Sequence, residues 1–134
     1  MKTSKVTYLG DLRTEAVHLA SGNNIITDAP VDNQGKGEYF SPTDLLATML
    51  ASCMLTIMGI MARQFKFSID GATAEVTKVM GTEPRRVNEV IIDFCFPAGL
   101  TEKDKKCIQV AVDNCPVGKS LHPDLKQTIH LNYA

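Results

Sequence analysis

Residues 41–65 read SPTDLLATMLASCMLTIMGIMARQF, and this stretch decides which folds the chain can adopt. Leu45 to Ala62 is a run of 18 residues without a charge, and Cys53 lies near its middle. Ser41 is a favourable N-cap, and Pro42 suits the first helical position, where an N–H would have no intrahelical partner. The stretch therefore predicts one long apolar helix that begins near Pro42 and ends near Arg63 to Phe65, where a basic side chain suits the C-terminus.

The apolar run has two structural interpretations. Its length reaches the lower limit for a membrane span. However, Thr48, Ser52, Thr56 and Gly59 form a small and polar ridge along one side, and the strands expected elsewhere are amphipathic. We therefore expect no membrane segment. A helix that is apolar nearly all round is otherwise buried, and one small sheet covers only one of its sides. We expect the second helix or another copy of the chain to cover the other side, which predicts a homodimer.

The rest of the chain contains strands and one further helix. Val90, Ile92 and Phe94 alternate with more polar residues, as in a half-buried strand, and Thr101 with Asp104 forms the pattern of a capping box. The predicted order is strands at 6–10, 12–20 and 23–27, a loop at 28–41, the long helix, strands at 72–76 and 90–96 joined through 81–84, a helix whose core-facing stripe includes Cys115, and a strand at 127–133. This order predicts a single α+β domain, residues 1–134, with mainly antiparallel sheets.

Composition excludes several classes of function. The chain has 134 residues and a net charge of −1, with 22% charged and 44% hydrophobic residues, as is usual for globular proteins. It lacks Trp and any long Lys or Arg run, which argues against a nucleic-acid partner. The N-terminal residues lack the apolar segment of a secretory signal. We therefore expect a cytoplasmic protein with reduced cysteines.

The four cysteines are the candidates for chemistry. They form no CxxC pair, and with the three histidines they give no spacing typical of a zinc site, so we expect no metal. We interpret Cys95 and Cys107 as structural. Cys53 has two interpretations from its helix alone. A free cysteine packs like a small hydrophobe, and it becomes a nucleophile only where a nearby positive charge holds it as a thiolate.

Two segments resemble the cysteine motifs of the OsmC/Ohr family, the osmotically inducible protein C and organic hydroperoxide resistance proteins. SPTDLLATMLASC (41–53) resembles the first motif, a Pro-containing entry into a long central helix with a reactive cysteine. NCPVGKSL (114–121) resembles the second, a Cys-Pro at a helix junction. Both occur in the family's order. The resemblance implies the OsmC/Ohr-like fold, with mainly antiparallel sheets around a long buried central helix, in an intertwined homodimer.

The resemblance also implies thiol-dependent reduction of organic hydroperoxides, without a cofactor, in oxidative stress defence. Cys53 would be the peroxidatic thiol, which becomes a sulfenic acid as the peroxide releases its alcohol. Cys115 would be the resolving thiol, which condenses with that sulfenic acid to a disulfide. A small dithiol or lipoyl-type reductant would then restore both thiols.

The charged residues that the family places near its reactive cysteine have less direct counterparts in this sequence. Arg13 follows the first turn as the family's arginine does, and would hold Cys53 as a thiolate. In peroxidase members a Glu directly follows the entry Pro. Here Thr43 stands at that position and the acid comes one step later, at Asp44, which also suits the helix dipole. Glu38 is another candidate acid. This departure motivates an alternative function, a non-catalytic dimeric module that binds a small hydrophobic or thiol-bearing ligand; a structural interaction protein is third.

Overall fold

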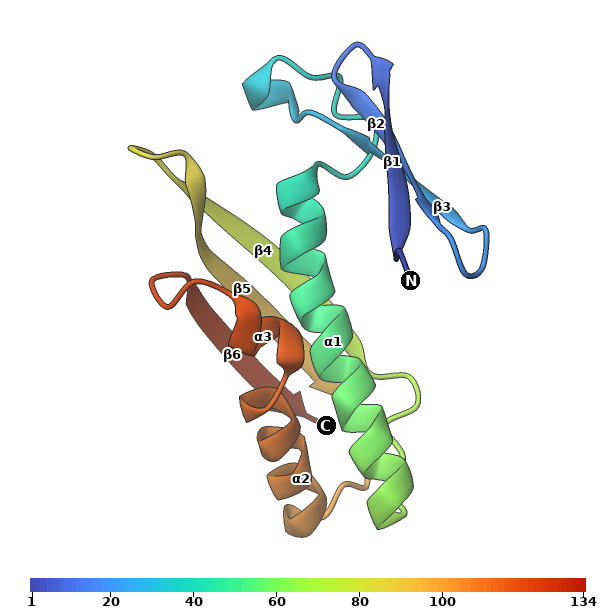
Figure 1. Cartoon of the computed structure of the whole chain (residues 1–134). Coiled ribbons are helices and arrows are strands. Elements are labelled where there is room, and N and C mark those ends of the chain that lie inside the picture. Colours follow the sequence, from blue (N-terminus) through green and yellow to red (C-terminus); the bar gives the residue numbers. More distant parts are fainter. The chain divides into compact units, whose positions relative to one another are not determined.

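The computed structural model describes all residues, 1–134, and they form two compact units, residues 1–45 and 46–134 (Figure 1). The elements in chain order are β1 (Ser4–Gly10), β2 (Arg13–His18), β3 (Asn24–Asp28), the short 3-10 helix η1 (Val31–Asn33), α1 (Pro42–Phe65), β4 (Thr73–Gly81), β5 (Arg86–Phe96), α2 (Glu102–Asp113), α3 (Pro116–Ser120) and β6 (Lys126–Tyr133). The predicted α+β class is confirmed. The single domain and the homodimer stay predictions.

The first unit is an antiparallel sheet of three strands in the order β1-β2-β3. A two-residue turn joins β1 to β2, and its central residues Asp11 and Leu12 have φ values of 53° and 64°. Positive φ at both central residues matches the twist of the flanking strands, which makes such turns favourable in hairpins. The turn starts β2 at Arg13, and the register of β2 with β3 places Arg13 opposite Asp28.

One face of this first sheet is apolar and open. Val6 on β1 is in register with Ala16 on β2, which is in register with Ile25 on β3, so the three side chains share a face. Val6 and Ile25 are exposed, as is Tyr8 two residues beyond Val6. The residues of the first unit therefore leave apolar sheet surface uncovered.

The second unit has a sheet in the order β4-β5-β6, with α1, α2 and α3 on one face (Figure 1). β4 and β5 form an antiparallel hairpin, whereas β5 and β6 pair in parallel across the connection that contains α2 and α3. Val90, Ile92, Phe94 and Phe96 alternate into the core and are buried, as predicted. The sheets are thus mainly antiparallel, and the parallel pair is a crossover that the strand pattern alone did not show.

Helix α1 buries one face and exposes the other. Its buried residues are Ala47, Leu50, Ala51, Met54, Met58 and Ala62. Leu46, Met49 and Ile60 are exposed. By length and composition α1 could cross a membrane, and 33% of its most apolar window is buried within the chain. Core helices of soluble proteins meet the same criteria, so the absence of a membrane segment stays a prediction.

Helix α2 begins at the predicted capping box. The Thr101 side chain accepts a hydrogen bond from the Asp104 N–H, and the Asp104 carboxylate accepts one from the Thr101 N–H. The helix buries Ile108 and Ala111 and ends at Asp113. Cys115 is buried as predicted, but it lies past the end of α2 rather than within it, because Pro116 starts the separate helix α3.

Candidate active site

Cys53 lies near the middle of α1, at the border between its two faces. The preceding residue, Ser52, is exposed and the following one, Met54, is fully buried. Cys53 itself is half-buried and packs against the hydrophobic core of the second unit. The position gives a thiol with apolar contacts on one side and partial access from the other.

Cys115 is the N-cap of α3 and is almost completely buried, with 1% of its surface exposed. Its sulfur accepts a hydrogen bond from the Gly118 N–H at 3.5 Å, and the Val117 N–H also interacts with it. Pro116 suits the first position of α3, since its φ is already helical and no N–H is lost from the helix there. The local sequence Cys-Pro-x-Gly thus directs backbone donors toward this sulfur.

The structure brings Cys53 and Cys115 together. The Cys53 thiol is near enough to the Cys115 thiol to interact with it. Burial raises the pKa of Cys115 above its usual range and the neighbouring Cys53 thiol raises it further, while the N–H groups of Gly118 and Val117 oppose the shift. A buried thiol of raised pKa stays protonated at neutral pH, so Cys115 is the poorer nucleophile in the resting pair.

The position of Cys115 depends on how α3 is attached to β6. The Gln127 side chain on β6 donates a hydrogen bond to the Gly118 carbonyl at 3.0 Å. A Cβ atom at Gly118 would lie 2.9 Å from the Gln127 Oε1 and 3.5 Å from a methyl group of Leu50 on α1. A side chain at position 118 would therefore displace Gln127, whose hydrogen bond attaches α3 to β6.

A second polar cluster lies in the first unit, around Arg13. Its Nε and Nη2 atoms donate to Oδ1 and Oδ2 of Asp28 at 2.7 and 2.9 Å, a bidentate ion pair. Nη2 also donates to Oε1 of Glu38 at 2.7 Å. The Arg13 Cζ lies over the ring of Tyr39, 4.8 Å from the ring centroid. Glu38, a candidate acid from the sequence, is therefore in direct contact with Arg13.

Asp28 was not predicted as a site residue. Its side chain is 1% exposed, and its Oδ2 also accepts the Glu38 N–H at 3.1 Å. The hydrogen bonds from Arg13 hold its pKa below the usual range, against the opposing effect of burial. Hydrogen bonds to Asp28 and Glu38 likewise raise the pKa of Arg13. The signal for Asp28 in the sequence is weak, because an acidic residue after a short apolar strand is as typical of a turn as of a functional site.

The structure places Asp44 at the start of α1. Its carboxylate accepts the Ser41 N–H at 3.0 Å, and its own N–H donates to the Ser41 hydroxyl at 3.0 Å. Thr43, at the position of the family's acid, has its hydroxyl 3.1 Å from that of Ser41. Asp44 thus closes a reciprocal capping box. Its catalytic role stays a prediction.

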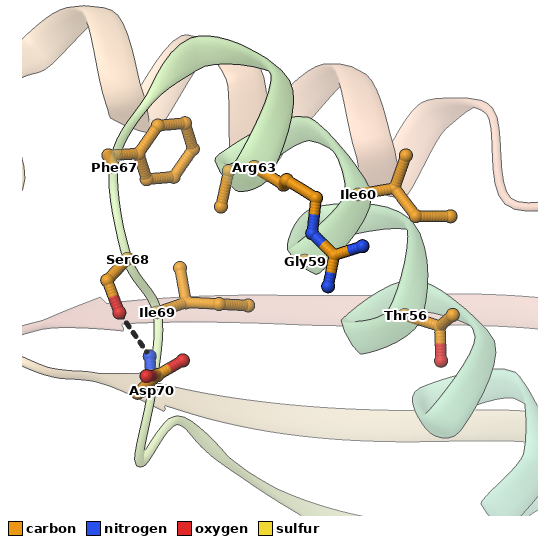
Figure 2. A pocket seen from close by; sticks show the side chains of 9 residues that line it. Thr56, Gly59, Ile60, Arg63, Phe67, Ser68, Ile69 and Asp70 are labelled. Atoms are coloured by element: carbon orange, nitrogen blue, oxygen red, sulfur yellow. Dashed lines mark hydrogen bonds between the residues drawn. The ribbon is translucent and has the colours of Figure 1, made fainter.

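The remaining candidates lie outside these clusters. Cys95 is exposed and Cys107 is half-buried, and both are free thiols. No group of three or more His, Cys, Asp or Glu side chains is arranged to hold a metal ion. A cavity of about 600 Å³ lies at the C-terminal end of α1, and Arg63, Phe67, Ile69 and Asp70 are among the residues that line it (Figure 2). Neither Cys53 nor Cys115 lines this cavity. A smaller, polar cavity of about 390 Å³ is lined in part by Cys115.

Comparisons with known proteins identify the family. Residues 35–130 match the model of the OsmC-like protein family. The chain belongs to the OsmC-like family. It is 62% identical to a provisionally named osmotic stress induced and detoxification response protein from Psychrobacter arcticus 273-4, with a TM-score of 0.95 over 98% of this chain and 96% of that chain. The family and fold predicted from the two cysteine motifs are therefore confirmed.

More distant OsmC-like structures share the fold. An OsmC like protein from Mycoplasma pneumoniae is 22% identical, with a TM-score of 0.80 over 99% of this chain and 98% of that chain. An organic hydroperoxide resistance protein OsmC from Legionella pneumophila is 16% identical, with a TM-score of 0.74 over 98% of each chain. None of the curated proteins searched matches the chain. At these identities the two structures establish the fold alone.

Proposed function

We propose that this OsmC-like protein is a thiol-dependent peroxidase that reduces organic hydroperoxides through Cys53 and Cys115. The observation that carries the proposal is the interaction between the two thiols, which are 62 positions apart in the chain and lie on α1 and at the N-cap of α3. Family membership supports it, because some OsmC-like structures are named organic hydroperoxide resistance proteins. The protein would serve in oxidative stress defence in the cytoplasm, where both thiols start reduced.

The first step is attack by the Cys53 thiolate on one peroxide oxygen. The O–O bond breaks, the S–O bond forms, and the alcohol leaves after its oxygen takes up a proton, so Cys53 becomes a sulfenic acid. Cys115 then attacks that sulfur and water leaves, which forms the Cys53–Cys115 disulfide. A small dithiol, of lipoyl type, exchanges with this disulfide and leaves as a cyclic disulfide, restoring both thiols.

The different surroundings of the two thiols support this assignment of roles. Cys53 is half-buried, so a hydroperoxide can approach it, whereas Cys115 is enclosed and its pKa is raised. In the second step, loss of a proton from Cys115 is assisted by the N–H groups of Gly118 and Val117, which favour the thiolate. The enclosed thiol thus responds to an oxidised neighbour rather than to the peroxide itself.

Arg13 is proposed as the group that holds Cys53 as a thiolate. A thiolate is the nucleophile, and a neighbouring arginine lowers the free energy of that form. Asp28 is the fixed partner of Arg13, with two hydrogen bonds to its guanidinium. Asp44 or Glu38 would provide the acidic partner that the family places after the entry proline, and the contact of Glu38 with Arg13 favours Glu38.

We also propose that the protein acts as a homodimer. Exposed apolar side chains on both units support this, among them Val6 and Tyr8 on β1 and Met49 and Ile60 on α1. A second copy would cover such side chains, and large exposed apolar patches are rare on monomers. Analytical ultracentrifugation of the reduced protein tests the proposal, and a monomer at micromolar concentration would contradict it.

The experiment for peroxidase activity is treatment of the reduced protein with one equivalent of cumene hydroperoxide, followed by peptide mass mapping. We expect a Cys53–Cys115 disulfide in the wild type and a Cys53 sulfenate in Cys115→Ser. Cys95→Ser is the matched control and should form the disulfide normally, because Cys95 lies on an exposed strand position away from the pair. Absence of both products would exclude the proposed chemistry.

The second candidate function is a dimeric module that binds a small hydrophobic or thiol-bearing ligand without turnover. The cavity at the end of α1, with its apolar wall of Ile60, Phe67 and Ile69, favours it (Figure 2). Sustained consumption of hydroperoxide with dihydrolipoamide, lost in Cys53→Ser, would exclude a purely binding role.

A further inference from the structure

The hydrogen bonds of Arg13 leave one edge of its guanidinium partly free. An arginine has five N–H bonds. Asp28 accepts one hydrogen bond from Nε and one from Nη2. These two bonds occupy the side-on edge of the guanidinium, which is the edge formed by Nε and Nη2. Glu38 accepts the second N–H of Nη2 through a single oxygen. The end-on edge, formed by Nη1 and Nη2, is thus half-occupied.

The two acids hold Arg13 in different ways. Asp28 is enclosed, with 1% of its side chain exposed, and also accepts the Glu38 N–H. The Glu38 side chain is 60% exposed and makes one contact. Because Asp28 fixes the Glu38 backbone, the Glu38 carboxylate can swing away by rotation of its own side chain. Asp28 is therefore a permanent partner and Glu38 a displaceable one.

The guanidinium stays in place when Glu38 leaves. Asp28 accepts hydrogen bonds from Nε and Nη2, and the Arg13 Cζ lies over the Tyr39 ring, 4.8 Å from its centroid. A planar guanidinium fixed in this way presents two parallel N–H bonds, the geometry that binds a carboxylate bidentately. An external carboxylate would form two hydrogen bonds at this edge, where Glu38 forms one.

We propose that the end-on edge of Arg13 is an exchangeable binding site for small carboxylates, which Glu38 blocks in the resting chain. Asp28 is the positioning residue of this site. Arg13, Asp28 and Glu38 together carry one net negative charge, and Lys36 adds a positive charge that acts on Asp28 at longer range. Removing the charge of Glu38 therefore favours an incoming anion. The inference deepens the proposed function and rests on it in one respect: a Cys53 thiolate held by Arg13 would also compete with Glu38.

The direct test measures binding without activity. In a Cys53→Ser background, acetate is titrated while the Arg13 side-chain N–H signals are followed by ¹⁵N NMR. Exposed ion pairs are weak, so we expect Glu38→Gln to bind acetate about two- to fivefold more tightly than the parent. Asp28→Asn should bind it more weakly. Glu15→Gln is the matched control, because it also removes one negative charge from the first unit. Glu15 lies on β2 and accepts a hydrogen bond from Asn24, so its substitution should leave the acetate affinity unchanged. Equal acetate affinity in the parent and Glu38→Gln, or no shift of Arg13 in either, would overturn the proposal.

A kinetic test in the presence of Cys53 separates this inference from the proposed function. The rate of Cys53 alkylation by iodoacetamide should increase in Glu38→Gln, and acetate should lower it. If Glu38→Gln binds acetate more tightly but Cys53 alkylation does not change, the carboxylate site stands and the assignment of Arg13 to Cys53 falls. If acetate affinity is the same in Glu38→Gln as in the parent, the proposal of a carboxylate site is refuted, whatever the result of the peroxidase assay.

Discussion

Oxidation of Cys53 and Cys115 to a disulfide should raise the stability of the protein considerably. In the reduced structure the two thiols interact with each other, so we expect a disulfide between them to need little movement of α1 or α3. The two cysteines are 62 positions apart, so the disulfide closes a long loop and restricts the unfolded chain. The stabilisation therefore comes chiefly from the unfolded state and not from new contacts in the folded one.

The size of the effect follows from the loop length. For a loop of about 60 residues the chain-entropy model gives roughly 4 kcal/mol at 25 °C. The entropy of unfolding is about 2.1 cal/mol/K per residue, or about 0.28 kcal/mol/K for a chain of this length. The melting temperature should therefore rise by roughly 15 °C on oxidation.

Calorimetry of the same sample before and after one equivalent of hydroperoxide measures this shift, with the disulfide verified by mass spectrometry. Adding a phosphine reductant should reverse it. Cys115→Ser should show no increase, whereas Cys95→Ser should behave as the wild type because its cysteine lies outside the pair. A verified disulfide with an unchanged or lower melting temperature would refute the reasoning, since it would mean that the bond forms only by straining the folded state.

Three further outcomes are expected. Iodoacetamide at neutral pH should label Cys53 before Cys115, because Cys115 is enclosed and its pKa is raised; equal labelling in a peptide map would contradict this. Leu50→Ala should lower the free energy of unfolding by about 2–5 kcal/mol in urea titrations, since Leu50 is fully buried, and a loss below about 1 kcal/mol would be too small for a core position. The pKa of Asp28 is lowered by the hydrogen bonds from Arg13, so Asp28 contributes stability that is present above its unfolded pKa of about 3.9 and lost as the pH falls through the folded pKa. Asp28→Asn should therefore lose less stability than the wild type on acidification, and thermal melts across the acid range with an unchanged pH dependence would disprove it.

Local signals in the sequence were enough for most of the secondary structure. Helix α1 begins at Pro42 as predicted, because Ser41 and Asp44 satisfy backbone groups within the same helical turn. The capping box at Thr101 and the buried face of β5 were likewise correct. These features depend on residues two to four positions apart, which a sequence displays directly.

Pairing across the chain was harder to predict. The parallel pairing of β5 with β6 joins residues more than 30 positions apart, and no local pattern specifies it. Asp28 meets Arg13 only because β2 and β3 adopt one particular register. The end of α2 at Asp113 removed Cys115 from the helix in which the apolar stripe had placed it, because Pro116 cannot continue α2.

By itself, the sequence determined the long apolar helix, the order of the elements and, through two motifs, the OsmC-like family. The apolar run from Leu45 to Ala62 predicted a helix that is buried by other parts of the protein, and the second motif predicted a partner thiol for its one cysteine. Only the tertiary structure decided that the Cys115 thiol interacts with that of Cys53, that it is the enclosed one of the two, and that Arg13 is hydrogen-bonded to Asp28 and Glu38. The physical reason is that burial and pKa depend on which groups packing brings together, and packing joins residues that the sequence keeps apart.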